Sequence, residues 1–296
     1  MEQTLTMEPR PAATAVAVSD AAERPHLTIR ASKGWVTLNL KELWQFRDLL
    51  GSLAGRDLKL RYKQTALGVI WVILGPLMAA GVFSFVFGTV AKMPSGKVPY
   101  FVLAFAGLLG WSFFSAILTK TSGCLVANTH LISKIYFPRL ILPLSNIGSA
   151  LVDFGVSLCM MGVLLAINRV APSPMGLLLF PIWMVILAAI AMGLGLCTAS
   201  LTVFYRDVQY ILPVFTQILM YASPVAYSLA PVPQRAQWVF SLNPLVPPLE
   251  AIRASLIGTP FPTAQSLVMS GVAAAVLFFG GLCAFKYMER KFADAI

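Results

Sequence analysis

Six long stretches of the chain are almost continuously apolar and are separated by short polar or charged segments. Each is about as long as the roughly 20 residues with which a helix crosses a hydrocarbon core about 30 Å thick. Only helices and closed barrels span lipid, and these runs do not alternate as barrel strands do, so the pattern predicts an all-α membrane protein with six transmembrane helices. The predicted spans are 66–90, 99–121, 140–167, 175–202, 209–228 and 264–286.

The segment before the first span combines apolar and polar residues at helical spacing. Its apolar stripe, with polar side chains opposite, predicts an amphipathic interface helix lying along the membrane surface. An ordinary amphipathic helix packed on a partner protein is the alternative. Gly51 and Gly55 interrupt the pattern and predict a bend. The stripe consists of Leu43, Phe46, Leu50 and Leu53, widened by Trp44 and Leu49.

By composition the chain has three parts. Residues 1–34 are rich in Ala, Glu, Pro and Thr, which predicts a disordered cytoplasmic tail without the apolar core of a cleaved signal peptide. Residues 35–63 hold the interface helix and a basic run, and residues 64–290 hold the six-helix transmembrane domain. The basic run contains Arg56, Lys59, Arg61 and Lys63.

The segment 229–263, between the fifth and sixth spans, is apolar but rich in proline. Because proline breaks long helices, a seventh full span is not expected, and short re-entrant helices are. Non-helical backbone at membrane depth has to be buried in protein or line a water-filled path. Both interpretations stay open here: a gate at the outer mouth, or a packed re-entrant hairpin.

The basic residues indicate how the chain is oriented. If the N-terminus is cytoplasmic, 17 of the 22 Lys and Arg residues lie on the cytoplasmic side, so both termini are expected there. The chain is 58% hydrophobic and only 11% charged, whereas a soluble domain carries about 25% charged residues. The net charge of +10 is therefore attributed to anionic lipid headgroups and topology, and no nucleic-acid partner is expected.

Recognisable catalytic motifs are missing from the sequence. There is no GxxxxGK[ST] phosphate loop, no HExxH and no GxSxG, and two histidines do not suggest a metal site. Asp153 is the one clear acid inside a predicted span. Since charge in lipid is costly, Asp153 is either functional or neutralised by protonation or by a polar neighbour. Any transport is therefore expected to take its energy from a separate ATPase.

Aromatic residues are concentrated in the first two spans. Their rings are candidates for lining a path, because aromatic faces stack on sugar rings, and they are equally candidates for an interfacial belt. The four candidates for channel lining are Trp71, Phe83, Phe87 and Trp111.

Several short motifs, in order over residues 38–290, resemble type-2 ABC transporter permeases, most closely those that export O-antigen, capsule or teichoic acid. Each is weak alone, but together they are fairly specific for this class. They are RYKQTALG at 61–68 with Trp71, LGPL at 74–77, VFG at 86–88, KIYFPR at 134–139, FYRDV at 204–208, SPV at 223–225 and NPL at 243–245.

The resemblance implies a transport subunit of the bacterial inner membrane that is not itself an enzyme. Two copies would form a channel for lipid-linked polysaccharide, and two separate ATPase subunits would bind ATP and Mg. The ATPase would contact a coupling helix at 127–139, and segment 229–263 would supply gate helices. The implied coupling residues are Asn128, His130, Lys134, Tyr136, Phe137, Pro138 and Arg139.

The resemblance also gives the basic run a possible substrate role. Cations at the lipid boundary would hold the phosphate of an undecaprenyl-diphosphate or phospholipid carrier, whereas plain topological anchoring is the simpler interpretation. Two other functions are weighed: an exporter of a drug or lipid without a glycan, and a membrane-embedded enzyme or scaffold. Neither the sugar nor the carrier lipid is identified by the sequence.

Overall fold

The computed structural model describes residues 40–63, 68–96, 98–227, 238, 240, 242–289 and 292. Within these ranges every regular element is helical. The predicted tail at 1–34 lies outside the described residues, as does most of the first part of the predicted gate segment.

Two helices precede the first span. Helix α1 covers Leu40–Gln45 and α2 covers Arg47–Lys63, so the break falls at Phe46. Helix α2 runs without a break through Gly51 and Gly55, where a bend was predicted, and it packs along α6. The predicted apolar stripe packs against the core of this same chain, while Trp44 stays 69% exposed.

Five helical segments among the described residues are long and apolar enough to cross a membrane. The first is continuous over Ile70–Val90, where α3 passes into a π-helix, η1. The elements that make up the five segments are α3 (Gly68–Phe83) with η1 (Ser84–Val90), α4 (Tyr100–Ala127), α6 (Ile141–Ile167), α7 (Pro174–Phe204) and α11 (Ala264–Glu289).

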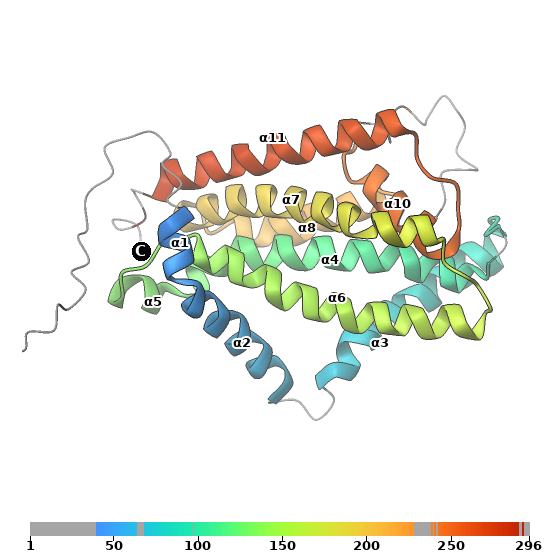
Figure 1. Cartoon of the computed structure of the whole chain (residues 1–296), viewed down its shortest axis with the longest axis horizontal. Coiled ribbons are helices and arrows are strands. Elements are labelled where there is room, and N and C mark those ends of the chain that lie inside the picture. The colour runs from blue at the N-terminus through green and yellow to red at the C-terminus, as the bar shows by residue number, and fades with distance from the viewer. Residues whose placement is uncertain are drawn as a thin grey trace, which may run out of the picture. The chain divides into compact units, whose positions relative to one another are not determined.

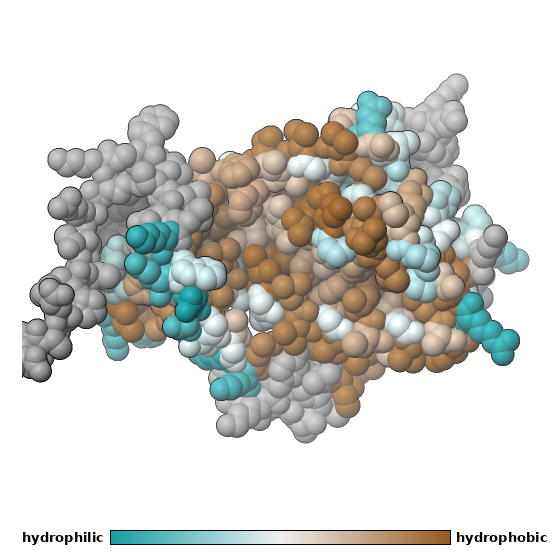
Figure 2. Space-filling model, viewed as in Figure 1, coloured by the Kyte–Doolittle hydropathy of each residue, from teal (hydrophilic) through white to brown (hydrophobic). Residues whose placement is uncertain are grey.

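Helix α4 lies at the centre of the bundle and is buried along most of its length. Helices α6 and α7 pack on it, and α11 packs along α7 (Figure 1). Figure 2 shows a broad apolar belt across the helices, with hydrophilic side chains gathered toward the ends. Such a belt is what lipid-facing helices require, because lipid cannot solvate exposed polar groups.

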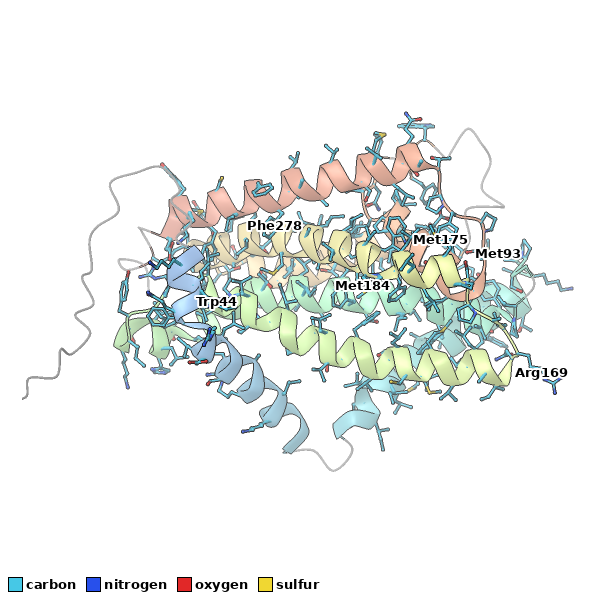
Figure 3. The ribbon with its side chains drawn as sticks, in the orientation of Figure 1. Trp44, Met93, Arg169, Met175, Met184 and Phe278 are labelled. Carbon is cyan, nitrogen blue, oxygen red and sulfur yellow. The ribbon has the colours of Figure 1, made fainter. Side chains whose placement is uncertain are left out.

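The two ends of the bundle hold different elements. The short helix α5 (Thr129–Lys134) lies at one end with α1 and the last turn of α11, and this end is called the α5 end. Helix α10 (Val246–Ile257) lies toward the other, called the α10 end. Figure 3 places Trp44 near the α5 end and Arg169 at the α10 end, where Arg169 points away from the helices.

The predicted fifth span is shorter than expected. Helix α8 covers Val208–Tyr221, which is 14 residues or about 21 Å and less than the hydrocarbon core. Residues 222–227 continue as turns, because Pro224 supplies no backbone donor and disfavours helical backbone at Ser223. These turns reach the N-terminus of α4, where the Tyr100 hydroxyl donates to the Ala226 carbonyl over 2.8 Å.

Helix α10 is buried on nearly all sides, packed against α4, α7 and α11. Its first turn contains Pro247 and Pro248, where a missing amide costs nothing, and it stops at Gly258 in the left-handed conformation. A 12-residue helix inside the apolar belt is too short to cross a membrane.

Candidate coupling and transport site

A buried arginine organises the α10 end. The Arg253 side chain is 2% exposed, and its guanidinium donates to the carbonyls of Pro224, Val225 and Tyr227 in the turns after α8. Cation and carbonyl dipoles attract strongly where water is excluded, so Arg253 fixes these turns against α10. This role was not predicted, because Arg253 lies in the segment 229–263 and was considered only as one of the five basic residues outside the cytoplasmic side.

A second polar cluster lies between α4 and α6, inside the apolar belt. The Lys120 ammonium lies 3.2 Å from a carboxylate oxygen of Asp153 and donates to Ser149 over 2.9 Å. Asn146 donates to the Lys120 carbonyl over 3.0 Å, so the two helices are joined by side chain and backbone. Asp153 therefore has a cationic partner within the membrane layer.

The position of Lys120 follows from a second span that is longer than predicted. The second span was predicted to end at 121, which put Lys120 at the boundary, but α4 continues to Ala127. Lys120 consequently lies seven residues, or about 10 Å, inside the helix end. The apolar and small residues after Lys120 allow the helix to continue, and Asp153 provides the counter-charge.

Asp153→Asn is expected to destabilise the folded protein by about 1–3 kcal/mol, because Lys120 would lose its counter-ion. The effect is smaller than for a fully buried pair, since the Lys120 side chain is 30% exposed. Apparent melting temperature in detergent measures it, with Asp207→Asn, an exposed position between α7 and α8, as the control. Lys120→Met in the Asp153→Asn background should recover most of the loss. Equal effects of Asp153→Asn and Asp207→Asn would contradict the prediction.

The predicted coupling segment occupies the α5 end. Helix α5 covers only Thr129–Lys134 of the predicted 127–139, and extended backbone follows because Pro138 disfavours helix before it. The segment has two sides. His130, Lys134 and Tyr136 are exposed, whereas Phe137 is buried and Pro138 and Arg139 are half-buried.

The basic run and the coupling segment meet at one hydrogen bond. Arg56 Nη2 donates to Asn128 Oδ1 over 2.9 Å, and Asn128 Nδ2 donates to the Cys124 carbonyl over the same distance. Two residues that the sequence assigned to different sites are thus in direct contact. Lys59 is exposed on α2, and the side chains of Arg61 and Lys63 lie outside those described.

The four candidate aromatic residues fall into two environments. Trp71 is exposed on α3, and Phe83 and Phe87 are half-buried with ring centroids 6.1 Å apart. Trp111 is 6% exposed and lies 5.3 Å from the ring of Phe114, within the core of this chain. Trp111 is therefore buried inside this chain, whereas Trp71 lies on its surface.

A polar and aromatic stripe on α8 was missed. Tyr210, Val214, Gln217 and Tyr221 recur at helical spacing and are all exposed. Helix α8 also exposes Ile211, Phe215 and Ile218, whereas the exposed large side chains of α11 are apolar over most of its length. A membrane-embedded surface with hydroxyl and amide groups is suited to protein or water, because lipid offers these groups no partner. The spacing was readable within the predicted span 209–228.

Residues 48–257 match the family of ABC-2 type transporters. The match covers more than two thirds of the chain and includes α4, α5, α8 and α10. The chain belongs to the ABC-2 type transporter family. Within this family member, the matched region contains Arg56, Asn128, Lys120, Asp153 and Arg253 and ends at the last residue of α10.

Three curated relatives extend the family assignment over most of this ABC-2 chain. It is 29% identical over 259 residues to the O-antigen export system permease protein RfbA of Myxococcus xanthus, covering 87% of this chain and 98% of that protein. It is 28% identical over 257 residues to RfbA of Klebsiella pneumoniae, covering 84% and 95%. It is 25% identical over 245 residues to the polysialic acid transport protein KpsM of Escherichia coli, covering 79% and 91%.

Proposed function

We propose that this ABC-2 chain is the permease subunit of an ATP-driven exporter of lipid-linked polysaccharide in the bacterial inner membrane. Its likeness, over most of its length, to permeases named for O-antigen export and polysialic acid transport carries the proposal. Two copies enclose the path, and two separate ATPase subunits, which bind ATP and Mg, supply the energy. The chain itself contributes no nucleotide loop.

A sixth crossing is part of this proposal. Helix α8 begins four residues after α7 ends at the α5 end, and the turns after α8 lie beside Tyr100 at the other end of α4. A short helix followed by buried turns therefore covers the distance, and α10 is the re-entrant helix that shields the turns. Non-helical backbone at this depth is tolerated because Arg253 and Tyr100 satisfy its carbonyls. Both termini are then cytoplasmic, with the α5 end facing the cytoplasm.

The transport path is proposed to run along α8 and α3. Tyr210 and Tyr221 offer ring faces for stacking on sugars, and Gln217 offers donors and acceptors for hydroxyl groups. Trp71, Phe83 and Phe87 add aromatic surface on the first span, and Trp111 remains a prediction. The apolar face of α11 is suited to lipid instead.

The exposed coupling residues are proposed to contact the ATPase. His130, Lys134 and Tyr136 project from this chain at the α5 end, whereas Phe137 and Arg139 hold the segment to the bundle. Through the contact between Arg56 and Asn128, the interface helix would follow any displacement of α5.

The basic run is proposed to hold the carrier phosphate, with Lys59 as its clearest test. A cation near the membrane surface is worth about 1 kcal/mol toward an anion, so Lys59→Gln should raise the glycan concentration that gives half-maximal stimulation of ATP hydrolysis about five-fold. Lys41→Gln, at an exposed position on α1 outside the basic run, is the control. Stimulation of ATP hydrolysis by purified lipid-linked glycan measures the shift. Identical curves for the two variants would contradict the phosphate role.

Deleting the gene tests the proposed function. Lipid-linked polymer should accumulate on the cytoplasmic side, and the chain supplied on a plasmid should restore surface polymer. The chain should also co-purify with an ATPase that lipid-linked glycan stimulates. Stimulation by a drug or glycan-free lipid alone would favour the alternative exporter, and failure to associate with any ATPase would refute the proposal.

A further inference from the structure

The last described residue of the chain is buried at the α5 end. Phe292 follows α11 by three residues, and its side chain has no exposed surface. Its ring centroid lies 5.6 Å from that of Phe285 on α11 and 6.1 Å from that of Phe204, the last residue of α7. Phe292 thus packs against the C-terminal parts of both long helices.

Arg139 contacts the same ring from the α5–α6 link. Its guanidinium carbon lies 5.6 Å from the Phe292 centroid, and its Nη1 donates to the Glu289 carbonyl over 3.0 Å. That carbonyl is at the C-terminus of α11, where helical carbonyls lack partners and a cation is favoured by the dipole. The Lys286 ammonium lies 2.7 Å from a carboxylate oxygen of Glu289 and holds its side chain.

We propose that Arg139 and Phe292 form a positioning latch that passes displacement of the coupling segment to α7 and α11. This inference rests on the proposed function, in which the ATPase moves α5. Arg139 lies five residues beyond α5, and Phe292 contacts both long helices, so the latch is a direct packed link among three elements. Close-packed side chains shift as a unit, because they have little free volume in which to absorb a displacement.

The latch differs from the contact between Arg56 and Asn128 in what it connects. Arg56 joins the coupling segment to α2, which packs on α6 and lies at the edge of the bundle. Arg139 joins it directly to the C-terminus of α11 and, through Phe292, to α7, which packs on α4, α10 and α11. A displacement through the latch consequently reaches the helix that contacts the buried α10, at the opposite end of the bundle.

The test uses the full chain with its ATPase partner and measures membrane abundance, ATP hydrolysis and polymer export together. Phe292→Leu keeps an apolar side chain but removes the aromatic face, and Phe292→Tyr keeps the face with the smallest change in volume. Export per ATP hydrolysed should fall about two- to thirty-fold in Phe292→Leu, the factor expected from a cation–π contact of a half-buried arginine, and stay closer to wild type in Phe292→Tyr. Phe279→Leu, at an exposed aromatic position on α11, is the matched control.

Arg139→Gln provides a second route, since glutamine retains a donor for the Glu289 carbonyl but no charge. Combined with Phe292→Leu it should lower the export-to-hydrolysis ratio no further than either change alone, because both remove one contact. The latch is refuted if the ratio is unchanged, or if export and hydrolysis fall together with abundance. Failure of the proposed function is distinguishable, because the wild-type chain would then show no ATPase-dependent export at all.

Discussion

Gly281→Ala is expected to lower the stability of the folded chain sharply, whereas Gly280→Ala, one residue earlier, should not. Helices α7 and α11 meet backbone to backbone at Gly193 and Gly281. A side-chain carbon built on Gly281 would overlap the Gly193 carbonyl, and one built on Gly193 would overlap the backbone of Leu277. Small residues are what allow membrane helices to approach this closely.

The size of the Gly281 effect follows from two opposed terms. Alanine is about 1 kcal/mol more favourable than glycine inside a helix, but overpacking a tight contact costs about 1–3 kcal/mol and more when backbone has to move. Here the overlapped atoms are backbone, so the second term dominates, and a net loss of about 2 kcal/mol or more is expected. Gly280 has open space around it, so only the favourable term applies there.

Apparent melting temperatures in one detergent at one scan rate decide the comparison, because membrane proteins often unfold irreversibly. The two variants share the chemical change, the helix and the sequence neighbourhood, and differ only in what the new methyl group meets. Equal melting temperatures for Gly281→Ala and Gly280→Ala would mean that the close crossing of α7 and α11 is wrong.

Hydrophobic runs predicted the long helices well, because lipid demands apolar side chains over a fixed length. The predicted spans at 140–167, 175–202 and 264–286 agree with α6, α7 and α11 to within a few residues. The run at 209–228 failed at its C-terminal end. The residues at this end are as apolar as those of the long helices, but residues 223–227 form turns, and residues distant in the chain donate hydrogen bonds to their carbonyls.

Two residues of the charge count lie at depth in the structure. Lys120 was assigned to the cytoplasmic side and Arg253 to the other side, but Lys120 lies seven residues inside α4 and Arg253 lies in the buried α10. Removing both from the count leaves 16 basic residues on the cytoplasmic side and 4 on the other, so the orientation argument is unaffected. A buried cation is recognisable only with its partner, and Asp153 is 33 residues away from Lys120.

The motif placed the predicted coupling segment along the chain, but it did not indicate what the segment contacts. The KIYFPR stretch at 134–139 lies between α4 and α6, and its coupling role stays a prediction. Arg139 is 150 residues from Glu289, and nothing in local periodicity connects them. The exposed stripe on α8 is a different case, because its helical spacing is present in the sequence. It was not predicted because the aromatic candidates were chosen on the first two spans alone.

Arg253→Leu is expected to unfold or loosen the α10 end, with a loss of about 3 kcal/mol or more. Leucine removes the cost of burying a charge, which works in its favour. It also leaves the carbonyls of Pro224, Val225 and Tyr227 without the guanidinium that now donates to them, at about 1–3 kcal/mol for each buried group. The loss at three carbonyls outweighs the gain from removing the buried charge. These carbonyls lie in turns that cannot form helix, so no helical hydrogen bond replaces the guanidinium.

Two variants separate the role of the guanidinium fork from that of charge. Arg253→Lys keeps the cation but lacks the planar fork that reaches several carbonyls, so it should fall between wild type and Arg253→Leu. Gly107→Ala should resemble Arg253→Leu, since a methyl group there would overlap the Val225 carbonyl. Arg169→Leu, at the exposed α10 end, is the control and should leave the melting temperature unchanged.

Export should fall together with stability in Arg253→Leu, because the proposed path runs along α8, which ends at these turns. Limited proteolysis measures the loosening directly, through faster cleavage after α8 in Arg253→Leu and Gly107→Ala than in Arg169→Leu. A melting temperature and cleavage rate in Arg253→Leu that match those of the control would show that the turns hold without the arginine. The cation would then be tolerated at this depth rather than required there.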